Sequence, residues 1–202
     1  MTPIDFFFFY GSTYTYLTVS RIEQAARNAG VDLRWRPFDV RAIMVEQDNI
    51  PFATKPVKMA YMWRDLERRA ARHGVDWASV PPYPLKNALL ANRVGIVALE
   101  EGWCPAYTKV AYRTWFLDGV PLGEPGTLEP ILTKVGQDPA RVIDAAQSDR
   151  VAKILDAETD AARSLGIFGS PSFAIGDEIF WGDDRLEEAL AWAGSAAGSP
   201  TA

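Results

Sequence analysis

Strand-forming sequence lies near the two ends of this chain of 202 residues, and a long helix-forming stretch separates the two regions. The aromatic run Ile4 to Tyr10 (IDFFFFY) is typical of a buried central strand, and the alternating segment Val31 to Phe38 (VDLRWRPF) of a second strand. Near the other end, Gly176-Asp177 is typical of a tight hairpin turn between strands at 172–175 and 178–181. Any sheet must therefore join strands from opposite ends of the chain.

Helices are expected in the connections between these strands. Ser12 or Thr13 suits an N-cap, so a helix is expected from there to Asn28, with Gly30 ending it. The resulting β-α-β opening favours a parallel strand pair with a right-handed crossover. Further helices are expected at residues 58–73, 87–101, 106–117, 128–135, 139–145, 149–165 and 184–192.

This order of elements predicts an α/β protein with a thioredoxin-like fold and a large all-helical insertion. Residues 1–38 and 168–193 are expected to form the thioredoxin-like domain, and residues 39–167 the helical insertion domain. Residues 194–202 are small and polar, so a flexible tail is expected there.

Composition argues against several classes of protein. The net charge is −5, with 21 basic and 26 acidic residues, whereas a general nucleic-acid binder would show a basic excess. Cys104 is the single cysteine, so no internal disulfide can form, which fits a reducing cytoplasm. Apolar runs are short and zinc-type spacings are missing, so we expect no signal peptide, membrane span or metal site. The single histidine, His73, is expected to end a helix rather than to catalyse.

Ser12 is the first candidate for a catalytic role. It follows the first strand at the turn where the helix begins, and a helix N-terminus stabilises an anion such as a thiolate. Thioredoxin-like redox proteins carry Cys-x-x-Cys at this turn, whereas Ser12-Thr13-Tyr14-Thr15 excludes a dithiol here. The alternative is that Ser12 only caps the helix.

Two further segments lie where the fold would bring them close to Ser12. Before the hairpin, a cis bond between Ser170 and Pro171 would expose the backbone of Ser170 for pairing with an extended peptide. The alternative there is an ordinary trans loop. After the hairpin, Asp183 and Asp184 either cap the last helix or receive a cationic amine.

Four short segments follow one another in an order and spacing that are specific, although each motif alone is weak. They are DFFFFYGSTYTYL at 5–17, NIP at 49–51 with PVK at 56–58, GSPSF at 169–173, and FWGDDRL at 180–186. In these segments the chain resembles the family of 2-hydroxychromene-2-carboxylate isomerases and kappa-class glutathione transferases. That family is a cysteine-poor branch of the DsbA-like thioredoxin superfamily, and the resemblance spans most of residues 4–192.

The resemblance implies how glutathione would be held near the first turn. Ser12 matches the family serine that hydrogen-bonds the glutathione sulfur. Ser170, before cis-Pro171, would present its N–H and C=O to the cysteinyl part of glutathione. Thr13 replaces the family's usual proline, and Ser170 replaces a usual small apolar residue, so the resemblance leaves the substrate open.

The resemblance also implies roles at the two ends of glutathione. Asn49 and Lys58 match polar residues near the site, with Lys58 against the glycine carboxylate. Asp183 and Asp184 match the γ-glutamyl end, where a carboxylate would receive the amine.

The implied activity is a glutathione-dependent isomerisation of aromatic catabolism, between 2-hydroxychromene-2-carboxylate and hydroxybenzylidene pyruvate. The other partner is then a small aromatic keto acid, and a cytoplasmic homodimer is expected. Aromatic side chains expected to line the substrate site are Phe8, Tyr14, Tyr61, Trp63 and Tyr83. Two alternatives remain: a kappa-class-like transferase or peroxidase, which consumes glutathione, and a non-catalytic thioredoxin-fold binding module.

Overall fold

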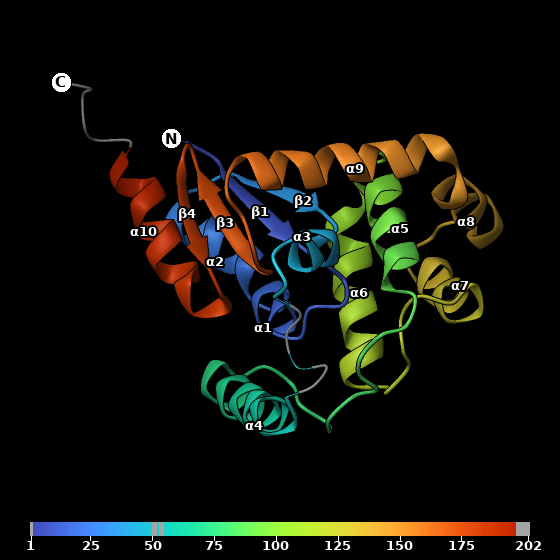
Figure 1. Ribbon diagram of the computed structural model, residues 1–202, viewed down its shortest axis with the longest axis horizontal. Helices are drawn as coiled ribbons and strands as arrows, with labels where there is room; N and C mark the ends of the chain where they lie inside the picture. Colours follow the sequence, from blue (N-terminus) through green and yellow to red (C-terminus); the bar gives the residue numbers. More distant parts are fainter. Residues whose placement is uncertain (1, 50–51, 53–54, 197–202) are drawn as a thin grey trace.

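One four-stranded sheet joins the two ends of the chain in the computed structural model, which describes residues 2–49, 52 and 55–196 (Figure 1). Its strands are β1 (Ile4–Phe8), β2 (Leu33–Pro37), β3 (Ser172–Ile175) and β4 (Glu178–Trp181), in the order β2-β1-β3-β4. β1 pairs with β2 in parallel and with β3 antiparallel, and β3 forms a hairpin with β4. The prediction of a single sheet built from both ends is confirmed.

Helices make up most of the remaining described chain. They are α1 (Thr15–Val19), α2 (Ile22–Ala29), α3 (Val40–Glu46), α4 (Pro56–His73), α5 (Ala88–Glu100), α6 (Cys104–Phe116), α7 (Pro125–Lys134), α8 (Pro139–Gln147), α9 (Asp149–Ser164) and α10 (Leu186–Ala196), with a short 3-10 helix η1 (Asp183–Arg185) before α10. The predicted fold class, thioredoxin-like with a large helical insertion, is confirmed. The division into two domains at residues 38/39 and 167/168 stays a prediction. No helix within the described ranges is long and apolar enough to cross a membrane.

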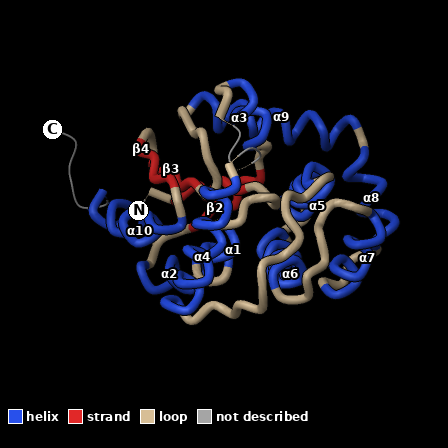
Figure 2. The backbone as a smooth tube through the Cα atoms, turned by 60° about the horizontal axis from the view of Figure 1, so that its bottom comes forward, coloured by secondary structure: helices blue, strands red, loops and turns tan. Residues whose placement is uncertain are grey.

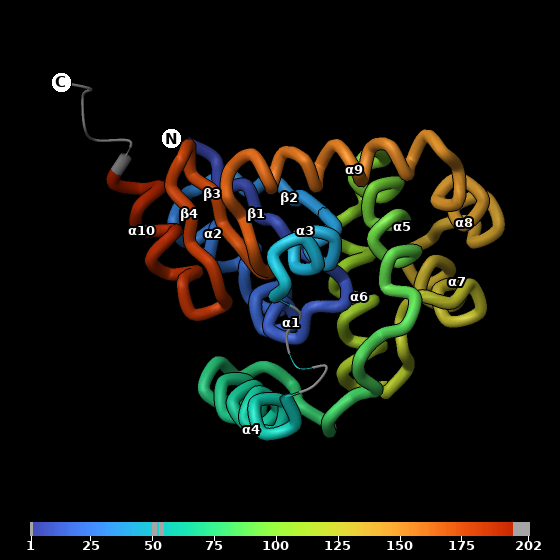
Figure 3. Tube along the Cα trace, viewed as in Figure 1, coloured from blue at the N-terminus to red at the C-terminus, as the bar shows by residue number. Residues whose placement is uncertain are grey.

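The helices fall into separate groups around the sheet. α2 and α10 pack against each other beside the sheet, and α10 also contacts β1, β3 and β4. α5 to α8 gather at the other end of the molecule, where α5 contacts β2 (Figure 2). α9 runs from this group back to the start of β3 (Figure 3). α4 stands apart from that group and packs on α1.

β1 is buried on both faces, as its uninterrupted aromatic sequence predicts. Phe6, Phe7 and Phe8 are each fully buried, and Phe6 stacks between Phe8 and Phe173 of β3, with ring centroids 4.9 and 5.7 Å apart. Aromatic side chains bury large apolar areas, and their stacking adds to the stability of such a core. Phe8 therefore belongs to the core and does not line a substrate site, which corrects the expectation for this residue.

The helix expected from residue 12 or 13 to Asn28 is interrupted. α1 ends at Val19 and α2 begins at Ile22, because Arg21 leaves helical geometry with φ −134°. Beside it, the Ser20 hydroxyl donates to the Tyr16 carbonyl at 2.8 Å, a contact that tends to bend helices. At this break the Arg21 side chain pairs with Asp183, near the other end of the chain.

The end of the chain also differs from the prediction. The flexible tail was expected to begin at residue 194, whereas α10 continues through Ala196. Alanine and serine in this stretch tolerate helix, and the helix is already anchored through the fully buried Ala193. The rest of the expected tail, residues 197–202, lies outside the described residues.

Candidate active site

Ser12 lies in the tight turn between β1 and α1 and contacts the loop before β3. Its N–H donates to the Phe9 carbonyl at 2.8 Å, which closes the turn. Its hydroxyl donates to the carbonyl of Ser170 at 2.7 Å, and the side chain is half-buried. The fold thus brings two candidate residues from opposite ends of the chain into direct contact.

Ser12 is not the N-cap of the helix that follows. The cap position is Tyr14, and no side chain there bonds the first backbone N–H groups. The Thr13 hydroxyl, the other expected cap, instead donates to the sulfur of Met62 on α4 at 3.2 Å. Because α1 has only five residues, its dipole adds little at this turn.

The loop before β3 holds Ser170 against the end of β1. The Ser170–Pro171 bond is cis, as predicted. The Ser170 hydroxyl accepts from the Phe9 N–H at 3.0 Å and lies 3.1 Å from the hydroxyl of Thr15. The described residues provide no acceptor for the Ser170 N–H, and its carbonyl has a second lone pair beside the bond from Ser12.

Asp183 and Asp184 are adjacent in sequence but occupy opposite environments. The Asp183 carboxylate is fully buried and receives Arg21 at 2.9 Å, Arg69 of α4 at 2.6 Å and the Thr18 hydroxyl at 3.0 Å. Its oxygens are thus engaged by the protein. The Asp184 side chain is 54% exposed, with one oxygen 4.0 Å from Arg69. The two carboxylates, which the sequence did not distinguish, are therefore not equivalent for ligand binding.

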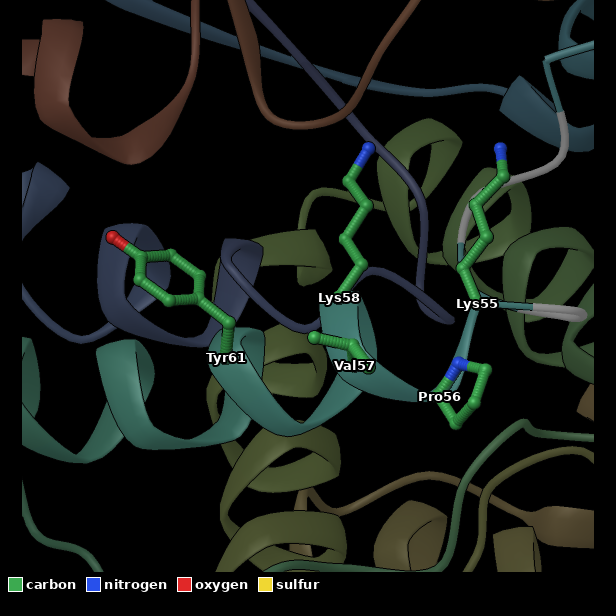
Figure 4. Close-up of a pocket in the computed structure, with 5 residues that line it drawn as sticks. All are labelled: Lys55, Pro56, Val57, Lys58 and Tyr61. Carbon is green, nitrogen blue, oxygen red and sulfur yellow. The ribbon is translucent and has the colours of Figure 1, made fainter.

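The start of α4 carries the expected Lys58 and a second lysine that sequence reasoning missed. A shallow cavity of about 540 Å³ is lined by Lys55, Pro56, Val57, Lys58 and Tyr61. Figure 4 shows Lys55 and Lys58 extending to the same side. Lys55 was overlooked because the helix was expected to begin at 58, whereas it begins at Pro56 and places Lys55 at its N-cap.

Asn49, expected near the same lysines, is exposed just beyond α3. Its backbone N–H donates to the Met44 carbonyl at 2.9 Å. Lys58 has a different neighbour, since its ammonium lies 5.6 Å from the ring centroid of Phe52, a cation–π distance. No contact between Asn49 and Ser12 or Lys58 is found among the described residues, so a role for Asn49 stays a prediction.

A family model described as a DSBA-like thioredoxin domain matches residues 3–191. The chain belongs to this DsbA-like family. It is 25% identical over 185 residues to a 2-hydroxychromene-2-carboxylate isomerase of Pseudomonas putida, covering 91% of this chain and 90% of that one. It is 24% identical over 197 residues to glutathione S-transferase kappa 1 of Caenorhabditis elegans, covering 91% and 87%.

A solved structure agrees with these sequence relatives. The structure of a 2-hydroxychromene-2-carboxylate isomerase superposes on this chain with a TM-score of 0.83 at 25% identity. The superposition covers 96% of this chain and 95% of that one. Nearly the whole length of this DsbA-like protein therefore shares its fold with the isomerase, helical insertion included.

This DsbA-like protein carries no thiol at the turn, and its one cysteine is remote from solvent. Cys104 is 1% exposed, and burial raises the pKa of its thiol to about 12. His73 ends α4, as expected, and burial, together with the nearby Arg21 charge, lowers the pKa of its imidazole. Neither residue hydrogen-bonds Ser12 or Ser170 among the described contacts.

Cys104 is expected to be chemically inert in the folded protein. With a pKa of about 12, only about one thiol in ten thousand is ionised at pH 8, and the thiolate is the reactive form. Ellman's reagent should therefore react with one thiol per chain in 6 M guanidinium chloride and with almost none in buffer. Cys104→Ala should retain turnover within about twofold; stoichiometric labelling of the native protein within minutes would contradict this assignment.

Proposed function

We propose that this protein is a glutathione-dependent isomerase of the 2-hydroxychromene-2-carboxylate type, acting on a small aromatic keto acid. The observation that carries the proposal is the contact between the Ser12 hydroxyl and the Ser170 carbonyl, beside a Ser170 N–H that has no acceptor among the described residues. Support also comes from the Pseudomonas putida relative named as such an isomerase, because the match covers about nine-tenths of each chain.

The polar groups around Ser12 fit a small peptide thiol. The Ser170 N–H has no acceptor in the described structure, and its carbonyl has one lone pair to spare, so both can pair with a peptide bond. Asp184 is the carboxylate that is exposed and able to receive the γ-glutamyl amine. Lys58, with Lys55 beside it, offers an ammonium group for the glycine carboxylate. We assign Asp183 a different role, because its carboxylate is already engaged by two arginines.

Glutathione, when bound, supplies the thiol that adds reversibly to the unsaturated keto acid and allows rotation about the former double bond. Ser12 would stabilise the ionised thiol by turning its O–H from the Ser170 carbonyl to the sulfur. That carbonyl would remain satisfied, because it can accept the peptide N–H of the ligand instead. The Thr15 hydroxyl contacts the Ser170 hydroxyl. This contact would keep the Ser170 backbone in place while its carbonyl changes hydrogen-bond partner.

Product analysis with purified protein tests this proposal. We expect interconversion of 2-hydroxychromene-2-carboxylate and hydroxybenzylidene pyruvate that requires glutathione, saturates with it, and leaves its concentration unchanged. Stoichiometric loss of thiol would instead identify a transferase, the activity named for the C. elegans relative. Absence of any heat of binding when glutathione is titrated would leave a non-catalytic module and overturn the proposal. We also propose a homodimer, which sedimentation equilibrium would measure.

A further inference from the structure

Arg41 is a half-buried cation without an acidic partner. It lies in the first turn of α3, directly after β2. Every Asp and Glu of the chain falls within the described residues, and none lies within ion-pair distance of the Arg41 guanidinium. The nearest acidic residue in sequence, Asp39, uses its carboxylate to accept from the backbone N–H groups of Arg41 and Ala42. The positive charge of Arg41 is therefore left available.

The guanidinium of Arg41 is held in a defined orientation. It packs over the ring of Phe9 at 5.2 Å from the centroid, and one N–H donates to the Leu85 carbonyl at 3.0 Å. Arginine has five N–H donors in a planar fork. The others have no acceptor among the described residues, so the fork is positioned before any ligand arrives.

Contacts connect Arg41 to the Ser12 turn on one side. The Phe9 ring packs directly on Gly11: a Cβ added at Gly11 would lie 2.5 Å from the ring atom Cε1 of Phe9. The same ring carries the Arg41 guanidinium on it. Only a glycine at this position lets the ring lie so close to the turn, so Arg41 is one aromatic ring away from the residue next to Ser12.

A second path leads from the neighbourhood of Arg41 to the turn by way of α4. Burial raises the pKa of the Tyr83 phenol, and the Arg41 charge opposes that rise, so Tyr83 lies within electrostatic range of Arg41. Tyr83 meets Trp63 of α4 edge to face, with centroids 5.3 Å apart. The adjacent Met62 accepts from the hydroxyl of Thr13, next to Ser12. The two paths therefore end at Gly11 and Thr13, the residues on either side of Ser12.

We propose that Arg41 binds the carboxylate of the aromatic acid that reacts at Ser12, with the substrate ring against Tyr83 and Trp63. This inference rests on the proposed function for the reaction, although the binding of the acid is independent of it. A planar, fixed guanidinium suits a carboxylate because it can donate two parallel hydrogen bonds. Lys58 lies on α4 and Lys55 is the N-cap of that helix. Both remain for glutathione, so the two anionic ligands would use separate cations.

The variants Arg41→Gln and Arg41→Lys, with Arg72→Gln as control, test this inference. Arg72 is an exposed arginine of α4 that forms no ion pair within the described structure, so its removal matches the change in net charge. The probes are hydroxybenzylidene pyruvate, which carries the carboxylate, and its methyl ester, which does not. Thermal melting of each variant would establish that it folds.

Arg41→Gln should raise the KM for hydroxybenzylidene pyruvate about 10- to 100-fold and change the KM for the ester less than about twofold. Arg41→Lys should recover part of this loss, because lysine keeps the positive charge but lacks the planar guanidinium that donates two parallel hydrogen bonds. The Kd for glutathione should stay unchanged in all three variants. Equal effects on acid and ester, or no effect on either, would overturn the proposal and leave Arg41 as a support for the Leu85 carbonyl.

A binding measurement separates this inference from the proposed reaction. Hydroxybenzylidene pyruvate titrated without glutathione should quench the fluorescence of Trp63, with a Kd that Arg41→Gln weakens by the same 10- to 100-fold. Trp63→Phe should remove the signal, which would identify Trp63 as its source. If turnover is absent but this Arg41-dependent binding persists, the acid site stands and the isomerase assignment fails. Binding of the acid that Arg41→Gln leaves intact would overturn the site itself.

Discussion

Replacing Ser12 with alanine is expected to lower turnover about ten- to hundredfold while changing glutathione affinity much less. A hydrogen bond to a charged partner contributes about 1.5–3 kcal/mol, and that contribution would be lost only when the sulfur is ionised. The peptide part of glutathione would still be held by the Ser170 backbone, Lys58 and Asp184. Initial rates and calorimetric titration would measure the two effects separately.

The same variant should shift the ionisation of bound glutathione. The Ser12 hydroxyl would stabilise the charged thiolate and so lower the thiol pKa; its removal should raise that pKa toward about 8.5, the value of a free cysteine. The pH at which activity is half-maximal should rise in parallel. Thiolate absorbance against pH measures this directly.

Ser164→Ala is the matched control for Ser12→Ala, since the exposed Ser164 hydroxyl also donates to a backbone carbonyl, that of Asp160, at 2.9 Å. It should alter neither turnover nor the thiol pKa. If Ser12→Ala behaved like this control in both measurements, Ser12 would serve only to tie the turn to the Ser170 loop, and the proposed mechanism would be wrong.

Asp183→Ala is expected to lower the free energy of unfolding by about 3–5 kcal/mol, as is usual when one partner of a buried ion pair is removed. Arg21 and Arg69, whose side chains are only 14% and 20% exposed, would lose their shared carboxylate. The Nε atoms of both arginines are buried and already lack a partner in the described structure, so little remains to compensate them. Urea denaturation followed by circular dichroism would measure the change.

The adjacent Asp184→Ala is the control, since its carboxylate is mostly exposed and 4.0 Å from Arg69; it should change stability by less than about 1 kcal/mol. High salt should leave the effect of Asp183→Ala largely intact, because buried charges are screened little. Equal, small losses in both variants would mean that Asp183 does not hold α4 and η1 together. Asp184→Ala, by contrast, should weaken glutathione binding.

The sequence by itself determined the strands, the fold class and the place of Ser12 and Ser170. These follow from local signals: an uninterrupted aromatic run, a Gly-Asp hairpin turn and a Ser-Pro step before it. Because strands of opposite chain ends had to share one sheet, the turn after β1 and the loop before β3 had to meet, and they do at the 2.7 Å bond from Ser12.

Only the tertiary structure decided which of two adjacent aspartates faces solvent, where the first helix breaks, and that Arg41 lies near the site. Asp183 and Asp184 are chemically identical, and they differ because Arg21 and Arg69 converge on one of them from 162 and 114 residues away. Arg21, which pairs with that same carboxylate, lies at the break between α1 and α2. Burial and the choice of partner depend on segments distant in the chain, so no local pattern of residues encodes them.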